Sequence, residues 1–394
     1  MKIAIVGCGF VSDYYLSTLK NYPGLELTKV FDKLPERARD VAERESVQAT
    51  ASLQEILTDQ DIEMVLNLTN PRDHFEVSKQ CLEAGKHVYS EKPFAMELEQ
   101  CQELYDLAKA KGLLIASAPC SILGESAQTM WQAIEDAKIG DVRLVYAEMD
   151  DGPIYHMSPE TWTSQSGLPW PVKDEYEIGC TLEHIGYCLN WLIGMFGGVE
   201  SVHAFSECVM KDKGVDNLDP ADTPDFSVAT LKFHSGVVAR ITCSIVAPHN
   251  HEMSIIGDKG VLKVDESWHY SSPVLLQKAS LTAHKAERYA WIRKSKILSW
   301  IFGLSFKKLP FKGTPNQKMK YKKDYMDYAR GVNELKDAIR GSKNQILTPE
   351  FCLHVNEVAL AVHYSYKSPG TYQMTTKYSS QKETLKKSPS LLTD

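Results

Sequence analysis

The sequence predicts an α/β protein with a doubly wound parallel sheet at the N-terminus and a C-terminal α+β domain whose open sheet is largely antiparallel. A chain of 394 residues is long for one domain, so two domains are expected. Strand-like and helix-like segments alternate over residues 1–120, which is typical of a parallel sheet covered by helices. Beyond residue 127, β-rich runs separated by turn residues dominate, as in an antiparallel meander.

Each expected strand of the first domain is a short apolar run. The segment "KIAIV" at 2–6 ends at Gly7 and suits a buried parallel strand. Further strands are expected at 25–32, 62–69, 86–90 and 113–119, with helices at 37–46, 52–57, 74–85 and 98–112. Gly85 and Gly112 fit the positions just past two helix ends. The first domain is therefore expected to span residues 1–120.

The second domain is expected at residues 121–374. A helix at 127–138 opens it, and a helix at 179–196 interrupts its strands. The β-rich runs lie at 142–149, 199–209, 225–236, 237–247 and 251–264, and helices at 327–341 and 351–366 close the domain. Residues 375–394 are polar and are expected to form a frayed tail.

Composition favours a cytoplasmic protein. The start "MKIAIVGCGF" runs straight into glycines, unlike a signal peptide, and no stretch approaches the length of an apolar membrane span. Nine cysteines without a Cys-x-x-Cys pair indicate neither a disulfide framework nor a zinc ribbon. The net charge of −7 and the lack of a nucleic-acid-binding motif argue against a nucleic-acid partner.

The segment "GCGFVS" predicts a Rossmann-type dinucleotide site. Gly7 permits a tight turn, and Gly9 lets the backbone approach a pyrophosphate at the start of the following helix. Phe10 and Val11 complete the loop, and Ser12 replaces the third glycine of the usual motif.

The residues after the second expected strand bear on which dinucleotide is bound. Asp32 lies where a carboxylate accepts ribose hydroxyls, which favours NAD. Lys33 and Arg37 lie nearby, and either would tolerate the extra phosphate of NADP.

The segment "GKHVYSEKPFA" at 85–95 resembles the glucose–fructose oxidoreductase/inositol dehydrogenase (Gfo/Idh/MocA) family of nicotinamide-dependent sugar oxidoreductases. Segments 67–88, 254–264 and 325–341 also resemble that family. The resemblance implies that Glu91 holds the ribose or orients the next residue, and that Lys92 lies beside the nicotinamide. It also implies that the nicotinamide and ribose are lined by Thr69, Asn70, Pro71 and His74.

Lys92 also has a chemical argument of its own. Loss of hydride from an alcohol carbon requires loss of the hydroxyl proton, and a partly dry lysine beside a cationic cofactor is expected to have a lowered pKa suited to that transfer.

The helix at 179–196 departs from the family pattern, in which an aspartate and a histidine stand four residues apart. Aligned by its leucine and glycine, "GCTLEHIGYC" puts His184 and Cys188 at those positions. A register slip of one would instead put Glu183 and Tyr187 there. We expect His184 to bind substrate or transfer a proton, and we expect no metal at Cys180, His184 and Cys188.

The loop at 158–179 contains aromatic and acidic side chains that suit a sugar. Rings stack on its C–H face and carboxylates accept its hydroxyls, so Trp162 and Trp170 are expected to contact substrate. Residues 150–157 are expected to contribute as well.

A basic insertion lies near 285–323, where twelve Lys or Arg accompany one acid, Glu287. Its aromatic part, 289–313, fits three uses: packing in an oligomer or core, contact with an anionic membrane surface, or binding of a substrate phosphate.

Together these observations predict an oxidoreductase that moves hydride between NAD(P) and a hydroxyl-bearing carbon of a sugar or sugar nucleotide. A homo-oligomer, dimer or tetramer, is expected. Two alternatives stay open: an enzyme that recycles NAD through oxidation and elimination, as a glycosidase or epimerase would, and a non-catalytic cofactor-binding regulator.

Overall fold

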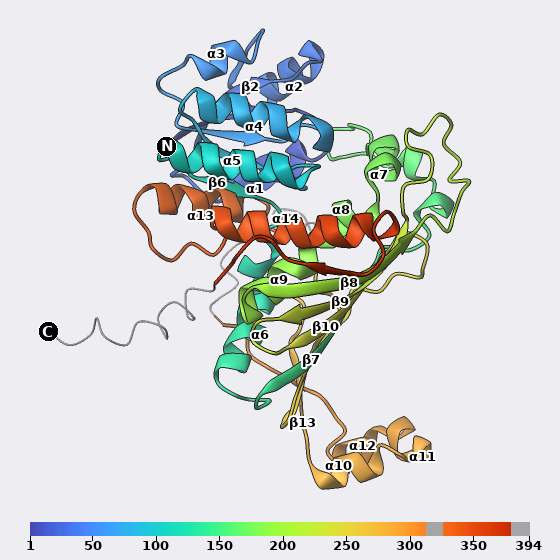
Figure 1. Cartoon of the computed structure of the whole chain (residues 1–394). Coiled ribbons are helices and arrows are strands. Elements are labelled where there is room, and N and C mark those ends of the chain that lie inside the picture. Colours follow the sequence, from blue (N-terminus) through green and yellow to red (C-terminus); the bar gives the residue numbers. More distant parts are fainter. Residues whose placement is uncertain (313–325, 380–394) are drawn as a thin grey trace, which may run out of the picture.

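The computed structural model describes residues 1–312 and 326–379 and contains two sheets stacked along the molecule (Figure 1). The N-terminal sheet has the strand order β3-β2-β1-β4-β5-β6, and every pairing in it is parallel. Its strands are β1 (Lys2–Val6), β2 (Glu26–Phe31), β3 (Gln48–Ala49), β4 (Met64–Asn67), β5 (His87–Ser90) and β6 (Ile115–Ser117). The predicted doubly wound parallel sheet is confirmed.

Helices cover this sheet because its central strands are buried on both faces. The first domain's helices are α1 (Ser12–Leu19), α2 (Pro35–Glu45), α3 (Gln54–Leu57), α4 (His74–Glu83) and α5 (Leu98–Ala110). Because the strands are parallel, the loops that follow β1, β4 and β5 meet at one edge of the sheet.

The C-terminal sheet has nine strands among the described residues, in the order β14-β13-β12-β11-β7-β10-β9-β8-β15. Only β7 and β10 pair in parallel within it, so the prediction of a largely antiparallel sheet is confirmed. The strands are β7 (Val142–Asp150), β8 (Val199–Glu207), β9 (Phe226–Phe233), β10 (Val238–Ser244), β11 (Met253–Gly257), β12 (Gly260–Val264), β13 (Leu275–Lys278), β14 (Lys307–Lys308) and β15 (Thr371–Gln373).

One face of this sheet is covered by helices and the other is open. Burial alternates along β9 and β10, as expected for a sheet with one packed face. The helices outside the basic insertion are α6 (Glu125–Glu135), α7 (Val172–Ile178), α8 (Cys180–His184), α9 (Gly186–Phe196), α13 (Ala329–Ile339) and α14 (Pro349–His363).

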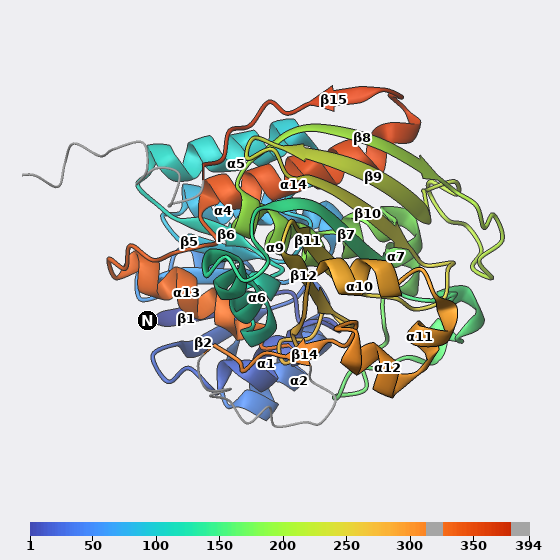
Figure 2. The ribbon, with the colours of Figure 1, turned by 90° about the horizontal axis from the view of Figure 1, so that it is seen from below.

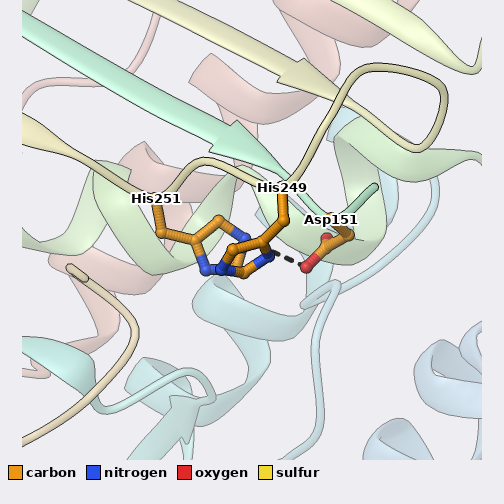
Figure 3. A group of neighbouring side chains, drawn as sticks. All are labelled: Asp151, His249 and His251. Atoms are coloured by element: carbon orange, nitrogen blue, oxygen red, sulfur yellow. Dashed lines mark ion pairs between the residues drawn. The ribbon is translucent and has the colours of Figure 1, made fainter. Parts of the chain in front are cut away.

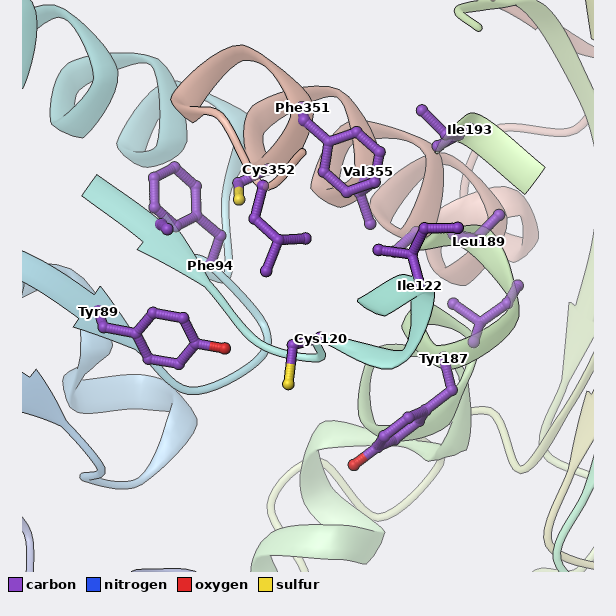
Figure 4. Packing of buried hydrophobic residues seen from close by; sticks show 14 of the residues in the cluster. Tyr89, Phe94, Cys120, Ile122, Tyr187, Leu189, Ile193, Phe351, Cys352 and Val355 are labelled. Carbon is purple, nitrogen blue, oxygen red and sulfur yellow. The ribbon is translucent and has the colours of Figure 1, made fainter. Parts of the chain in front are cut away.

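A continuous apolar core joins the two sheets (Figure 4). This core contains Tyr89 and Phe94 of the first domain together with Phe351 of α14 and Leu189 of α9. Helix α14 contacts α5 on one side and β8 on the other. The two sheets therefore share one core, and the cleft between them lies within a single packed unit.

Three expectations about local structure were wrong. The helix expected at 179–196 is interrupted at Ile185, which gives α8 and α9. The loop expected at 158–179 contains α7. Residues 375–379 of the expected frayed tail are ordered, because Glu357 accepts backbone N–H groups from Thr375 and Thr376 at 2.8 and 2.9 Å. The remainder of that tail, 380–394, lies outside the described residues.

The basic insertion forms three short helices that extend away from the C-terminal sheet (Figures 1 and 2). They are α10 (Leu281–Ala286), α11 (Ala290–Lys294) and α12 (Lys296–Ile301). Trp291 is 62% exposed and Trp300 is 71% exposed. The part at 313–323 lies outside the described residues. None of the described helices is both long and apolar enough to cross a bilayer.

Candidate functional site

A cavity of about 720 Å³ lies between the loops of the parallel sheet and the C-terminal domain. It runs from Gly9 in the loop after β1, past Lys92 in the loop after β5, to His251 before β11. The candidate residues that line it are Gly9, Phe10, Val11, Arg37, Thr69, Asn70, Pro71, His74, Glu91, Lys92, Trp162, Trp170, Glu183, His184 and Tyr187. The structure thus brings most of the predicted site residues to one place.

The loop after β1 has the geometry of a phosphate cradle. Gly7 has φ +96°, and a Cβ there would lie 2.4 Å from the carbonyl oxygen of Leu68. At Gly9 a Cβ would meet only Arg37, at 3.9 Å, so the space above this residue is open. Ser12 donates a hydrogen bond to the carbonyl of Gly9 at 2.6 Å and begins α1. These residues fit a dinucleotide pyrophosphate at the helix N-terminus.

The charged residues around this cradle differ in how free their side chains are to bind a ligand. The Asp32 carboxylate is buried and accepts N–H groups from Cys8 at 2.7 Å and Leu34 at 2.8 Å, and it does not line the cavity. Lys33 pairs with Asp73 at 2.7 Å. Arg37 lines the cavity and forms no ion pair with a described side chain, so it is the cation most open to a bound anion.

His74 and Asn70 hold the wall of the cavity together. The ring nitrogens of His74 lie 2.7 Å from the carbonyl of Pro93 and 2.9 Å from that of Thr69. Burial lowers the pKa of His74, although the two carbonyls oppose the shift. Asn70 donates to Asp174 of α7 at 2.7 Å, which connects the two domains.

Glu91 is fixed from both sides. Its carboxylate accepts from the Tyr15 hydroxyl at 2.6 Å and from the backbone N–H of Lys92 at 3.0 Å. The peptide bond between Lys92 and Pro93 is cis. Glu91 therefore fixes the position of the lysine backbone at the cavity.

Lys92 forms an ion pair with Glu183 across the cavity. Burial alone would lower the pKa of Lys92, but the carboxylates of Glu183, Glu91 and Glu175 outweigh burial and raise it. The lowered pKa expected from the sequence is therefore wrong for this form of the protein. Burial and Glu175 raise the pKa of Glu183, while Lys92 opposes that shift.

His184 is enclosed by carboxylates. Its Nδ1 lies 2.5 Å from Asp151 and its Nε2 lies 2.5 Å from Glu175. Burial would lower the pKa of His184, but these two carboxylates raise it well above its usual value. Both ring nitrogens thus face protein carboxylates, so the ring serves better to position those groups than to shuttle a proton.

The helix pair α8–α9 shows which residues face the cavity. Glu183 and Tyr187 line the cavity, as in the slipped alignment. The Cys188 thiol is buried and donates to the carbonyl of Ile185 at 3.2 Å. Burial raises the pKa of Cys188 to about 12, so it stays a neutral thiol of the core.

Aromatic rings form two walls of the cavity. The rings of Trp162 and Trp170 lie 5.0 Å apart in the loop before α7. That loop is anchored to α1, because Asp13 accepts from Ser164 at 2.6 Å and from the backbone of Ser166 at 2.8 Å.

The second wall was not predicted. Trp268, which follows β12, stacks on Tyr187 with ring centroids 4.0 Å apart. It also stacks on His251 at 5.3 Å.

A cluster of ionisable residues beside Trp268 was also missed (Figure 3). His251 lies 3.0 Å from Asp151 and 2.7 Å from Glu266, and His249 lies 3.1 Å from Glu266. Burial opposes the shift, but Asp151 and Glu266 raise the pKa of His251 to about 9. The segment "HNH" carried a usable signal, because residues two apart in an extended segment point to the same side.

Three features stand together in this cavity. There is a cradle for a dinucleotide, a lysine–carboxylate pair beside it, and a cavity that combines rings with hydrogen-bonding acids.

Comparison with known proteins agrees with the dinucleotide cradle. Residues 1–118 match an oxidoreductase family model with an NAD-binding Rossmann fold, and residues 127–263 match the GFO/IDH/MocA C-terminal domain.

Among curated proteins, the chain is 25% identical over 272 residues to trans-1,2-dihydrobenzene-1,2-diol dehydrogenase of Bos taurus, covering 68% of this chain and 75% of that one. It is 24% identical over 270 residues to inositol 2-dehydrogenase/D-chiro-inositol 3-dehydrogenase of Lactiplantibacillus plantarum, covering 67% and 71%.

Among solved structures, aldose-aldose oxidoreductase from Caulobacter crescentus shares the fold with a TM-score of 0.73 at 17% identity, covering 95% of this chain and 99% of that one. UDP-N-acetylglucosamine 3-dehydrogenase from Acidithiobacillus ferrooxidans does so with a TM-score of 0.66 at 18% identity, covering 93% and 97%.

Proposed function

This chain belongs to the Gfo/Idh/MocA oxidoreductase family, and we propose that it is an NAD-dependent dehydrogenase of a sugar, cyclic polyol or sugar nucleotide. The observation that carries the proposal is the ion pair between Lys92 and Glu183 in the cavity that begins at the phosphate cradle. A bound nicotinamide supplies the acceptor for the hydride.

Lys92 is proposed to bind the reacting hydroxyl. Its ammonium group donates a hydrogen bond to the substrate oxygen and stabilises the negative charge that develops there. As the hydroxyl proton moves to Lys92, Lys92 passes one of its own protons to Glu183, so the proton ends on the carboxylate. Burial raises the pKa of Glu183, which suits it to accept that proton.

The substrate class is proposed from the walls of the cavity. Trp162, Trp170 and Trp268 offer ring faces for the apolar side of a sugar ring. Glu175 and Glu266 offer carboxylate oxygens for its hydroxyls. His184 holds Asp151 and Glu175 in place by contacting both.

NAD is proposed in preference to NADP because Asp32 directly follows β2, where a carboxylate would repel the additional phosphate. Arg37 beside the cradle would then contact the pyrophosphate. A higher kcat/KM with NAD than with NADP supports this choice, and the reverse preference contradicts it.

The test is a substrate screen with the full chain. We expect the protein to bind NADH, measured by fluorescence, and to form NADH with at least one compound from a panel of cyclic polyols, hexoses and sugar nucleotides. A protein that binds neither dinucleotide would overturn the proposal. So would dinucleotide binding that never leads to reduction with any compound of the panel.

A further inference from the structure

Asp151, His249 and His251 are brought together by an isolated β-bridge between their neighbours in sequence. Asp150 at the end of β7 pairs with Asn250, with N–H···O distances of 3.0 and 2.8 Å. Asp151 follows the first of these residues, and the two histidines flank the second. One ligand atom from each of the three side chains lies within 4.8 Å of the others.

The two imidazoles are oriented by one carboxylate. Glu266 lies 2.7 Å from Nδ1 of His251 and 3.1 Å from Nε2 of His249. Each ring therefore keeps its other nitrogen for a further ligand. A carboxylate behind the imidazole is the usual support of a metal-binding histidine.

The Nε2 atom of His251 is buried without a hydrogen bond to any described residue. It lies 3.0 Å from Oδ1 of Asp151 in an ion pair, yet it forms no hydrogen bond within the described part of the chain. The His251 side chain is only 4% exposed, so solvent does not satisfy this atom. From the opposite side, Nδ1 of His184 lies 2.5 Å from Oδ2 of Asp151, also as an ion pair without a hydrogen bond among the described residues.

We propose that Asp151, His249 and His251 bind one divalent transition-metal ion, with zinc as the best match. Two imidazole nitrogens and one carboxylate oxygen form a donor set that suits zinc, whereas magnesium and calcium prefer oxygen alone. Zinc holds its ligands at roughly 2.0–2.2 Å, so the donors must move closer together. His249 can make most of that movement because its side chain is 57% exposed.

Three protein ligands leave at least one position of the ion open toward the cavity. A substrate hydroxyl or carbonyl oxygen can occupy that position. The proposal that the ion binds depends only on the three side chains. The proposal that the ion contacts a sugar hydroxyl rests on the proposed function.

The test measures zinc bound to the full chain by equilibrium dialysis after chelator treatment, with metal analysis of the protein. The buffer is mildly alkaline because ligand imidazoles must be neutral. The wild type is expected to bind one zinc per chain, and His249→Ala and His251→Ala are expected to bind it at least tenfold more weakly. His203→Ala removes an exposed histidine on β8 and is expected to bind like the wild type.

His249→Ala is the decisive variant because the side chain is 57% exposed, so its removal is expected to leave the fold intact. Cobalt added in place of zinc is expected to give visible absorption bands that His249→Ala loses. No stoichiometric zinc in the wild type, or equal zinc in His249→Ala, would overturn the proposal. NADH binding by the same samples separates this result from the proposed function, because the dinucleotide cradle contains none of these residues.

Discussion

Gly7 and Gly9 stand two residues apart in one loop, yet they are required for different physical reasons. Gly7 has a positive φ and no room for a Cβ against Leu68, so a side chain there would disturb the fold. Gly9 has room for a Cβ in the protein itself. A methyl group at Gly9 would instead occupy the space proposed for the pyrophosphate.

Gly9→Ala is therefore expected to weaken NADH binding on the order of tenfold or more with little change in thermal stability. Gly7→Ala is expected to lower the free energy of unfolding by more than the ~1 kcal/mol of an ordinary glycine replacement. Fluorescence titration and thermal melting measure the two effects. Normal NADH affinity in Gly9→Ala would show that this loop does not hold the dinucleotide.

Helix α14 carries a buried histidine that links it to the second sheet. The N–H of Val199 donates to Nε2 of His354 at 2.9 Å, and Nδ1 lies 2.7 Å from the Thr376 hydroxyl. Burial lowers the pKa of His354 to about 4, with Glu357 opposing the shift and His234 adding to it.

The pH dependence of stability follows from this shift. An unfolded histidine titrates at about pH 6.5, so the unfolded chain binds more protons than the native chain below that pH. The contribution of His354 to the free energy of unfolding is fully present above this pH. It is lost as the pH falls toward 4, which lowers the free energy of unfolding by about 3 kcal/mol.

His354→Gln is expected to reduce the slope of unfolding free energy against pH by about one proton between roughly pH 4 and 6.5. His363 is also buried with a pKa of about 4 and should keep its own share of the slope in the variant. Urea unfolding across this range measures the slope. An unchanged slope in His354→Gln would contradict the assignment.

The helices α10–α12 expose aromatic and apolar side chains beside lysines and arginines. Trp291, Ile297 and Trp300 are each more than 60% exposed. Such a surface matches an anionic lipid headgroup region, where rings lie at the interface and cations meet phosphates. We expect this segment to bind anionic membranes.

In co-sedimentation with phosphatidylserine vesicles, the wild type is expected to bind at low salt and not to bind neutral vesicles. The double variant Trp291→Ser/Trp300→Ser is expected to bind on the order of tenfold more weakly, since it loses both exposed indoles. Wild-type protein that stays in the supernatant at low salt would remove the lipid interpretation and leave a partner subunit or a substrate phosphate.

On the open face of the C-terminal sheet, exposed apolar side chains lie among charged ones such as Arg240 and Glu148. Tyr146 on β7 is 42% exposed and Phe205 on β8 is 54% exposed, and the strand register puts both on this face. Leu144 extends the same surface. We propose that a second copy of the chain packs against this face of the sheet.

Light scattering is expected to find a dimer or tetramer for the wild type and a shift toward monomer for Tyr146→Glu. Leu34→Glu replaces an equally exposed apolar residue of the first domain and is expected to keep the wild-type assembly. A monomeric wild type at micromolar concentration would contradict this interface.

The first domain was predictable because its signals are local. The glycine loop lies directly between a strand and a helix, and the cavity-lining residues after β4 and β5 follow short apolar runs. The contacts that decide the chemistry are not local. Lys92 and Glu183 are 91 positions apart, and Glu183 was named only through a resemblance.

The residues that the C-terminal domain contributes to the site depend on how distant segments pair and on where a helix breaks. The sequence revealed neither. The bridge between Asp150 and Asn250 puts His249 and His251 beside Asp151. The break at Ile185 lets Glu183 and Tyr187 face the cavity while Cys188 stays in the core. Neither effect follows from composition or periodicity in a single segment.

The proposed role of Lys92 is tested by the rate of NADH formation by Lys92→Met with the compound that the wild type oxidises. We expect kcat to fall by roughly 10²–10⁴-fold with NADH affinity nearly unchanged, because the variant loses proton transfer and keeps the cradle. Lys79→Met, at a lysine on α4 paired with Glu103, should retain wild-type activity. A Lys92→Met enzyme within about twofold of the wild-type kcat would show that Lys92 does not take part in proton transfer.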